Sequence, residues 1–159
     1  MTLVVQNTLD PQLYNTLATL TGSQTIANKT LKVVKEPVTL AGAAPGGTPD
    51  FDVATQSIVL YNTATQNFIL NVCGNSTTTL NSLVGVGETV GISLLVPTGP
   101  GYYLTGVTVD GSSANLTLKY QGGGGFTIGN ANSIDLYMLF LIKTGDNTWT
   151  GFISQTKYA

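Results

Sequence analysis

The carboxy-terminal two thirds of the chain consist of short runs of Val, Ile, Thr, Tyr and Phe separated by Gly, Asn, Asp and Pro. The runs recur roughly every 8–12 residues, which is the spacing of strands and turns in a two-sheet domain. The pattern therefore predicts an all-β domain at 50–159, a sandwich of the jelly-roll kind. Its expected strands are 57–61, 67–72, 89–96, 102–109, 115–120, 133–143 and 148–154.

Two turn sequences are expected to close hairpins between neighbouring strands. Asp110 and Gly111 lie between two runs whose apolar residues alternate, and an Asp-Gly pair supplies the positive backbone angles of a tight turn. Gly145, Asp146 and Asn147 are expected to reverse the chain in the same way before the last strand.

The segment 41–49 is rich in Gly, Pro and Ala, which favours neither a helix nor a strand, and we interpret it as a linker. Upstream, Asp10 followed by Pro11 is typical of a helix start, and a helix is expected at 11–20. Its apolar stripe is too narrow for a free-standing helix, so it must pack on the domain or on copies of itself. Residues 1–40 are therefore interpreted as an extended docking or trimerisation arm, whose candidate contacts are Leu13, Leu17 and Leu20.

Scarcity of charge excludes most kinds of active site. The 159 residues contain no His and no Arg, and only 9% of them are charged, against roughly a quarter in an ordinary domain. Proton transfer usually uses His, phosphate recognition uses Arg, and metal sites use clusters of His and Cys. No catalytic residue, cofactor or metal site is therefore expected. A net charge of -2 also argues against nucleic-acid binding.

No membrane insertion or secretion is expected from the sequence. The first residues have neither a basic flank nor an apolar core of the length found in a secretory signal. The most continuous apolar run, 136–142, is far shorter than the roughly 18 residues of a membrane helix. Cys73 has no second cysteine to pair with, so we expect it to be a small buried hydrophobic residue.

The run 136–142 does not alternate between apolar and polar residues, unlike the other expected strands. A strand with this sequence is apolar on both faces, so its outer face must be covered. The cover is either a folded-back arm or a neighbouring subunit. Because few charges oppose association, self-association is the simpler explanation, and a homotrimer is the expected form.

Two parts of the sequence resemble bacteriophage proteins. The stretch from Leu20 to Leu31 is LTGSQTIANKTL, which closely resembles the GxQTLxNKTL element of fibres and other virion structural proteins of tailed bacteriophages. The carboxy-terminal part is similar to a β-sandwich module at the ends of phage fibres, especially in phages of cyanobacteria and marine bacteria. The similar stretches are VGETV at 86–90, YYLT at 102–105, VDG at 109–111, GNANSID at 129–135 and KTGDNT at 143–148.

The resemblance implies a trimeric virion structural protein on the phage surface, assembled in the host cytoplasm. The motif begins about twenty residues from Met1, which leaves no room for a long shaft. A short fibre, a knob, a capsid decoration or a small tail-tip or baseplate subunit fits the length better, with 1–40 docking on other tail, baseplate or capsid proteins. The alternative from another class is a stand-alone carbohydrate-binding module, which would be monomeric and would bind glycans.

Candidate receptor contacts lie in a glycine-rich loop and on exposed aromatic rings. Binding residues often sit on loops held by a rigid scaffold, and sugar faces stack on aromatic rings. A simple flexible turn explains the glycines equally well, and core packing explains several of the aromatic residues. The candidates for contact with a host-surface glycan are Tyr102, Tyr103, Gly123, Gly124 and Phe126.

Paired carboxylates raise a further alternative, polysaccharide cleavage, because glycosidases use two acidic side chains. Asp50 and Asp52 are two residues apart and share a strand face, but a solvated edge or a Ca²⁺ contact explains them as well. Asp110 and Asp146 already have turn roles. With so few charges in the chain, we expect that the protein is not an enzyme.

Overall fold

The computed structural model describes residues 35–42 and 45–159. The chain divides into two units, Met1–Val34 and Lys35–Ala159, and the second of them is the domain described below. The helix expected at 11–20 lies outside the described residues, and so do the candidate docking contacts Leu13, Leu17 and Leu20.

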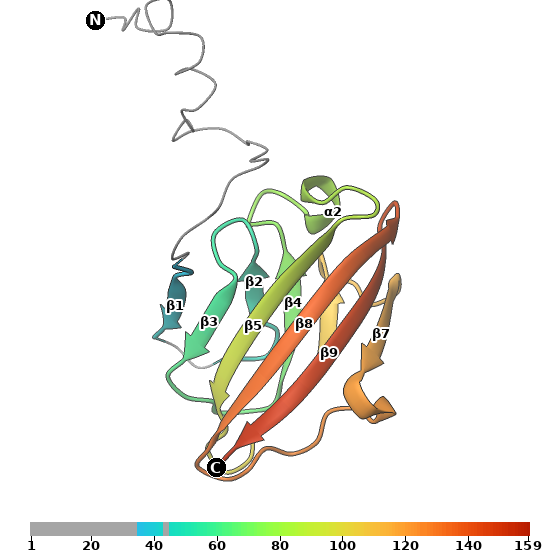
Figure 1. Ribbon diagram of the computed structural model, residues 1–159. Helices are drawn as coiled ribbons and strands as arrows, with labels where there is room; N and C mark the ends of the chain where they lie inside the picture. Colours follow the sequence, from blue (N-terminus) through green and yellow to red (C-terminus); the bar gives the residue numbers. More distant parts are fainter. Residues whose placement is uncertain (1–34, 43–44) are drawn as a thin grey trace, which may run out of the picture. The chain divides into compact units, whose positions relative to one another are not determined.

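The domain is built on a six-stranded sheet with the order β1-β3-β5-β8-β9-β7 (Figure 1). The two longest strands, β8 and β9, form an antiparallel pair inside this sheet, and β5 flanks β8. The strands are β1 (Val38–Ala41), β3 (Ile58–Tyr61), β5 (Thr89–Pro97), β7 (Leu116–Tyr120), β8 (Ile134–Gly145) and β9 (Thr148–Tyr158).

A three-stranded sheet with the order β2-β4-β6 forms the second layer and lies behind the large sheet in Figure 1. Its strands are β2 (Asp50–Asp52), β4 (Phe68–Cys73) and β6 (Leu104–Val109). Two short helical segments complete the described domain, α2 (Leu80–Leu83) and the 3₁₀ turn η1 (Gln121–Gly123). No helix within the described ranges is both long and apolar enough to cross a membrane.

The prediction of an all-β domain is confirmed, and each of the seven expected strands is present within a few residues of its expected bounds. The pairing differs from that of a jelly roll, whose strands are antiparallel. From β1 to β6 the chain alternates between the two sheets, so β1, β3 and β5 are parallel, as are β2, β4 and β6. The chain leaves one sheet, forms a strand in the other sheet and then returns. The strand that it forms on its return lies beside the earlier strand and runs in the same direction.

Of the two expected hairpins, one is confirmed and one is wrong. Asp146 and Asn147 form the turn between β8 and β9, with Asn147 at φ 47°. Asp110 and Gly111 have the predicted positive φ values, 48° and 82°. The strands that they join, however, belong to different sheets, so this turn carries the chain from one layer to the other.

The domain begins earlier than expected from the sequence. Val38–Ala41 is the edge strand of the large sheet rather than part of an arm, because it pairs with β3 in parallel. Most of the expected linker 41–49 is also tied to the domain. The carbonyl oxygens of Gly47 and Pro49 accept hydrogen bonds from the amides of β4 residues, at 2.9 and 3.0 Å. Pro45 is buried.

Both sheets contribute their inward faces to one apolar core. Trp149 and Tyr137, from the large sheet, are the largest side chains that are fully buried. Burying a Val, Leu, Ile, Phe or Met side chain in such a core stabilises the fold by roughly 1.5–3 kcal/mol. The small sheet supplies Phe51, Phe68, Leu70, Val72, Leu104, Val107 and Val109 to the same core.

Asp110 links the turn after β6 to the start of α2. Its carboxylate accepts hydrogen bonds from the amides of Leu80 and Asn81, at 2.7 and 3.0 Å. The Thr79 hydroxyl caps the same end by accepting from the Ser82 amide at 3.1 Å. A four-residue helix is not stable by itself, so its position depends on these contacts from outside the helix.

We expect Asp110→Ala to lower the free energy of unfolding by about 2–3 kcal/mol, because it leaves two amides without their acceptor and places Ala at a positive φ. Asp110→Asn, which tolerates this backbone conformation and keeps one acceptor oxygen, should lose less. Urea unfolding followed by circular dichroism measures both variants. Equal stability of Asp110→Ala and the unsubstituted protein would contradict this role.

Candidate interaction surface

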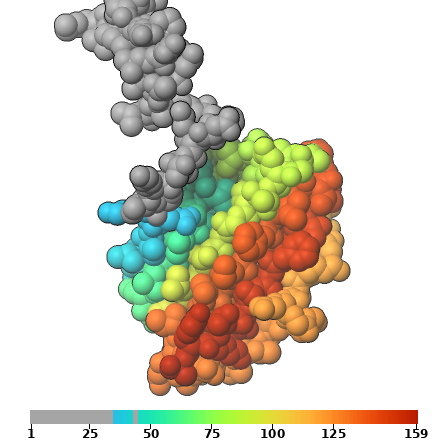
Figure 2. Space-filling view, in the orientation of Figure 1, coloured from blue at the N-terminus to red at the C-terminus, as the bar shows by residue number. Residues whose placement is uncertain are grey.

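Apolar side chains cover much of the outward face of the six-stranded sheet, from the edge strand β1 to β9, which lies next to the other edge. We call this surface the apolar face. In Figure 2 it is the side on view, with β5, β8 and β9 crossing it as adjacent bands. Alternating burial along each strand and the strand register define its members: Val38, Leu40, Ile58, Leu60, Leu95, Ile134, Leu136, Met138, Phe140, Ile142, Phe152 and Tyr158.

Phe140 and Phe152 form the centre of the apolar face. They are cross-strand partners on β8 and β9, and each side chain is 49% exposed. The Phe140 ring lies over Gly91 of β5, where an added Cβ would be only 3.0 Å from it. Glycine thus allows the ring to lie close to the neighbouring strand. Met138 and both phenylalanines border a hollow of about 370 Å³ that ends at β7.

The apolar face confirms the prediction that the run 136–142 is apolar on both sides. Tyr137, Leu139 and Leu141 are fully buried in the core, while the residues between them point outward. The two faces of β8 therefore lie in different environments although both are apolar. One is the core of the domain, and the other has no covering element among the described residues.

Charge is missing from the apolar face. None of the outward positions of β3, β5, β8 and β9 carries a charged side chain. Lys119, on the edge strand β7 beside Phe152, is the nearest one in the register. Large contiguous apolar patches on a protein surface usually mark contact sites.

The outward face of the three-stranded sheet has the opposite character. Asn71 at its centre donates to the Asp50 carboxylate at 2.7 Å and accepts from the Thr108 hydroxyl at 3.0 Å. The amide of Gly111 also donates to the Asn71 side chain, at 2.7 Å. These polar groups are hydrogen-bonded to one another and accessible to water. The two layers therefore present one apolar and one polar face.

The predicted receptor contacts do not form one site. Gly124 and Phe126 border a hollow of about 290 Å³, whose lining includes neither Tyr102 nor Tyr103. Phe126 packs edge-on against Tyr120 and Tyr137, with ring centroids 5.0 and 5.8 Å apart.

Two further candidates also have packing or turn roles. Tyr102 is partly buried against the core. Gly123 is exposed at φ 79°, a conformation that glycine adopts easily. For Phe126, Tyr102 and Gly123 the structure thus favours the alternatives of core packing and a simple turn.

The acidic side chains outside the core hold turns and strands. Besides Asp110, which caps α2, Asp146 accepts from the Asn81 side chain at 3.0 Å. Glu88 accepts from the Gly85 amide at 2.7 Å and closes the turn before β5. Within the described part of the chain, no three His, Cys, Asp or Glu residues are placed to hold a metal ion.

One carboxylate is fully buried, which the sequence did not reveal. Asp135 accepts hydrogen bonds from the Tyr137 hydroxyl at 3.2 Å and from the Gln155 amide at 2.6 Å. Gln155 also binds both the amide and the carbonyl of Thr127, so the group ties the loop before β8 to β9. Burial raises the pKa of Tyr137 well above its ordinary value, which keeps its hydroxyl neutral.

Cys73 is a buried free thiol, as predicted. Its sulfur lies 3.6 Å from the carbonyl oxygen of Phe51. Burial raises the pKa of the thiol, and the nearby carboxylates of Asp50, Asp52 and Asp110 raise it further. A thiol held neutral in this way is a poor nucleophile.

No family model, curated protein or solved structure matches the chain.

Proposed function

We propose that this protein is a structural subunit of a bacteriophage particle. In this role it forms a short homotrimeric fibre, knob or decoration on the tail or capsid surface and contributes to host attachment. It assembles in the host cytoplasm and projects its β domain outward. The observation that carries the proposal is the apolar face, a surface suited to permanent contact in a chain with few charges.

A second copy of the same chain is the partner that best fits the apolar face. Homo-oligomer interfaces are more apolar than other contact surfaces. Because the apolar face has no charged side chains, it cannot form ion pairs with a charged surface of another protein. Each copy brings Phe140, Phe152 and Met138 as large side chains, and Ser93 and Ser154 as small residues between which they can pack. The resemblance of 20–31 to phage fibre proteins favours a closed ring of three copies.

The residues before the domain are the proposed attachment arm. Because Val38–Ala41 belongs to the sheet, the arm ends near Lys35 rather than at residue 40. In this proposal Leu13, Leu17 and Leu20 contact another virion protein. A docking contact made largely of apolar and uncharged side chains suits a particle that does not need to release its parts.

The mass of the protein in solution tests the assembly. Light scattering of the full chain at micromolar concentration is expected to give three times the 16.6 kDa of one chain. A second form that begins at Lys35 keeps β1 and the whole apolar face, so it is expected to remain associated. Monomers in both cases would contradict the trimer and would favour an isolated glycan-binding module.

Location on the particle needs a separate test. Antibodies raised against the full chain are expected to label purified particles of the phage that encodes it, as seen by immunogold electron microscopy. An antibody against a host cytoplasmic protein is the control for trapped material. Absence of label on intact and on detergent-treated particles would contradict a virion role, whatever the oligomeric state.

A further inference from the structure

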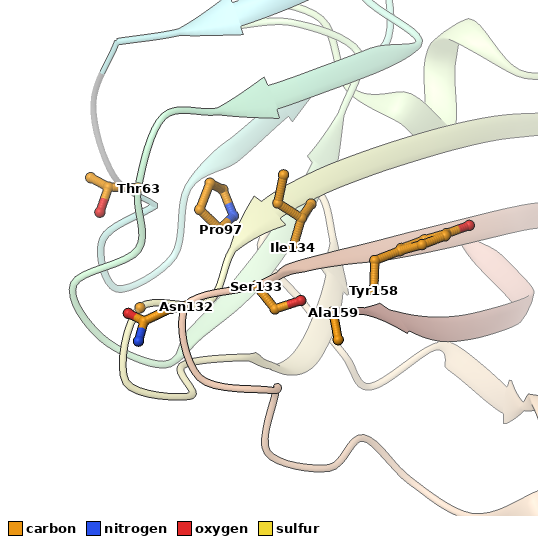
Figure 3. A pocket seen from close by; sticks show the side chains of 8 residues that line it. Thr63, Pro97, Asn132, Ser133, Ile134, Tyr158 and Ala159 are labelled. Carbon is orange, nitrogen blue, oxygen red and sulfur yellow. The ribbon is translucent and has the colours of Figure 1, made fainter.

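A pocket of about 520 Å³ lies at the end of the six-stranded sheet, where β5 and β9 end and β8 begins (Figure 3). We call it the sheet-end pocket. Its volume falls within the range of roughly 300–1,000 Å³ that small-molecule sites occupy. It is lined by side chains from three strands and by the turns beside them, chiefly Thr63, Pro97, Asn132, Ile134 and Tyr158.

One wall of the sheet-end pocket is apolar and contains an aromatic ring. Pro97 pairs with Ile134 in the register of β5 and β8, and Ile134 pairs with Tyr158 across β8 and β9. The three side chains therefore stand in a row on one side of the sheet. Ile134 is 40% exposed and Tyr158 is 54% exposed, so both leave surface for a ligand.

The rim of the sheet-end pocket carries polar groups that are not used by the fold. Asn132 is held at φ 55° in the turn before β8, and its backbone amide donates to the Gly99 carbonyl at 2.6 Å. Its side-chain amide makes no hydrogen bond to any other described residue. The Tyr158 hydroxyl is likewise without a partner in the described part of the chain. The backbone is thus fixed while donors and acceptors remain free.

The chemistry of the lining selects a class of ligand. No Lys, Asp or Glu side chain lines the pocket, so no side chain of the lining pairs with a charged ligand. A purely apolar ligand would bury the Asn132 amide without a hydrogen-bond partner, which is costly. A pyranose ring fits both requirements, because its C–H face stacks on an aromatic ring while its hydroxyl groups meet the polar rim. We propose that the sheet-end pocket binds a neutral saccharide.

The pocket and the centre of the apolar face are separate enough to act independently. Ile134 and Phe140 lie six residues apart on β8, which corresponds to roughly 20 Å along a strand. Contact between subunits around Phe140 and Phe152 can therefore leave the end of the sheet open. The idea that the particle meets its host at this pocket rests on the proposed function. The idea that the pocket binds a saccharide does not depend on that function.

Nuclear magnetic resonance of the isotope-labelled full chain tests the proposal with maltose, lactose and N,N′-diacetylchitobiose. At least one of these sugars is expected to give saturable shifts of the Asn132 and Tyr158 amide signals, with a dissociation constant on the order of 1 mM. 1-Hexanol serves as the apolar probe. Saturable binding of hexanol with no binding of any of the three sugars would overturn the proposal, and so would a lack of binding by all four.

Two substitutions locate the binding. Tyr158→Ala removes the stacking ring and is expected to weaken binding about tenfold. Asn132→Gly removes the amide while keeping a residue that accepts a positive φ, and binding should weaken several-fold in a folded protein. Val86→Ala, at an exposed residue outside the pocket and before the other end of β5, is the control and should bind as the unsubstituted chain does. Unchanged affinity in Tyr158→Ala and Asn132→Gly would overturn the assignment.

The same samples separate the two proposals. Saccharide binding by a monomeric chain would support the saccharide site and contradict the trimer. A trimer that binds none of the sugars would contradict the saccharide site and support the trimer.

Discussion

Replacing both Phe140 and Phe152 with Lys is expected to separate the proposed trimer into monomers. The two rings lie side by side at the centre of the apolar face, and each is about half exposed in the single chain. In a subunit interface they would be the buried anchors, and anchors of this kind carry most of the binding energy. Two ammonium groups without partners there would have to lose their water, which costs several kcal/mol per charge.

The expected size of this effect is an increase of at least about a hundredfold in the dissociation constant of the subunits. Light scattering over a dilution series measures it, and circular dichroism checks that the sheet is retained. Val86→Lys is the matched control, because Val86 is an exposed apolar residue in the turn before β5 and away from the apolar face. A double variant that keeps the mass of the unsubstituted protein would show that the apolar face is not the interface.

Replacing Lys143 with Ala is expected to lower the free energy of unfolding by about 3–4 kcal/mol. Lys143 lies on the inward side of β8 and is only 6% exposed. Its ammonium group donates to the carbonyl oxygens of Asn81 and Val84, at 2.5 and 3.0 Å, and lies 5.9 Å from the centre of the Trp149 ring. It thereby binds carbonyls at the end of α2, which the short helix cannot pair internally.

The loss has two parts that can be separated. Lys143→Met keeps most of the side-chain volume but leaves the two carbonyl oxygens without their donor, so we expect a loss of about 2 kcal/mol. Lys143→Ala adds an unfilled space next to Trp149 and should lose more. Lys119→Ala, on the edge strand β7, is the control and should change stability by less than about 0.5 kcal/mol.

Urea unfolding at one protein concentration compares these variants, because the proposed association would make stability depend on concentration. If Lys143→Ala is as stable as Lys119→Ala, the ammonium group does not hold α2.

The local predictions succeeded where a property depends on a few neighbouring residues. Asp110 and Gly111 adopt the positive φ values predicted for an Asp-Gly pair, and the seven predicted strands are present. The strand pairing could not be predicted in the same way, because alternation of apolar residues is the same in parallel and antiparallel strands. The hairpin expected at Asp110 failed because alternation also does not show which of the two sheets a strand joins. The sequence pattern also gave no sign of β1, whose four residues are at least partly exposed.

The candidate site was predictable only in part. Uninterrupted apolar residues at 136–142 predicted a second apolar face that needs a cover, and the structure adds Phe152 from β9 and Leu60 from β3 to it. The sheet-end pocket was not predicted, because Pro97, Asn132 and Tyr158 are distant in sequence and meet only through the register of three strands. The loop candidate Phe126 is partly buried and packs against the core instead.

The sequence by itself determined which segments form strands and whether one or both faces of each strand are apolar. Both follow from backbone preferences and from the period of two along a strand. It also determined the scarcity of ionisable groups. The tertiary structure alone decided which strands are neighbours, in which direction they run, and which distant side chains share a surface. These depend on how the chain crosses between the two sheets to bury both inward faces at once, a condition on the whole domain rather than on any segment.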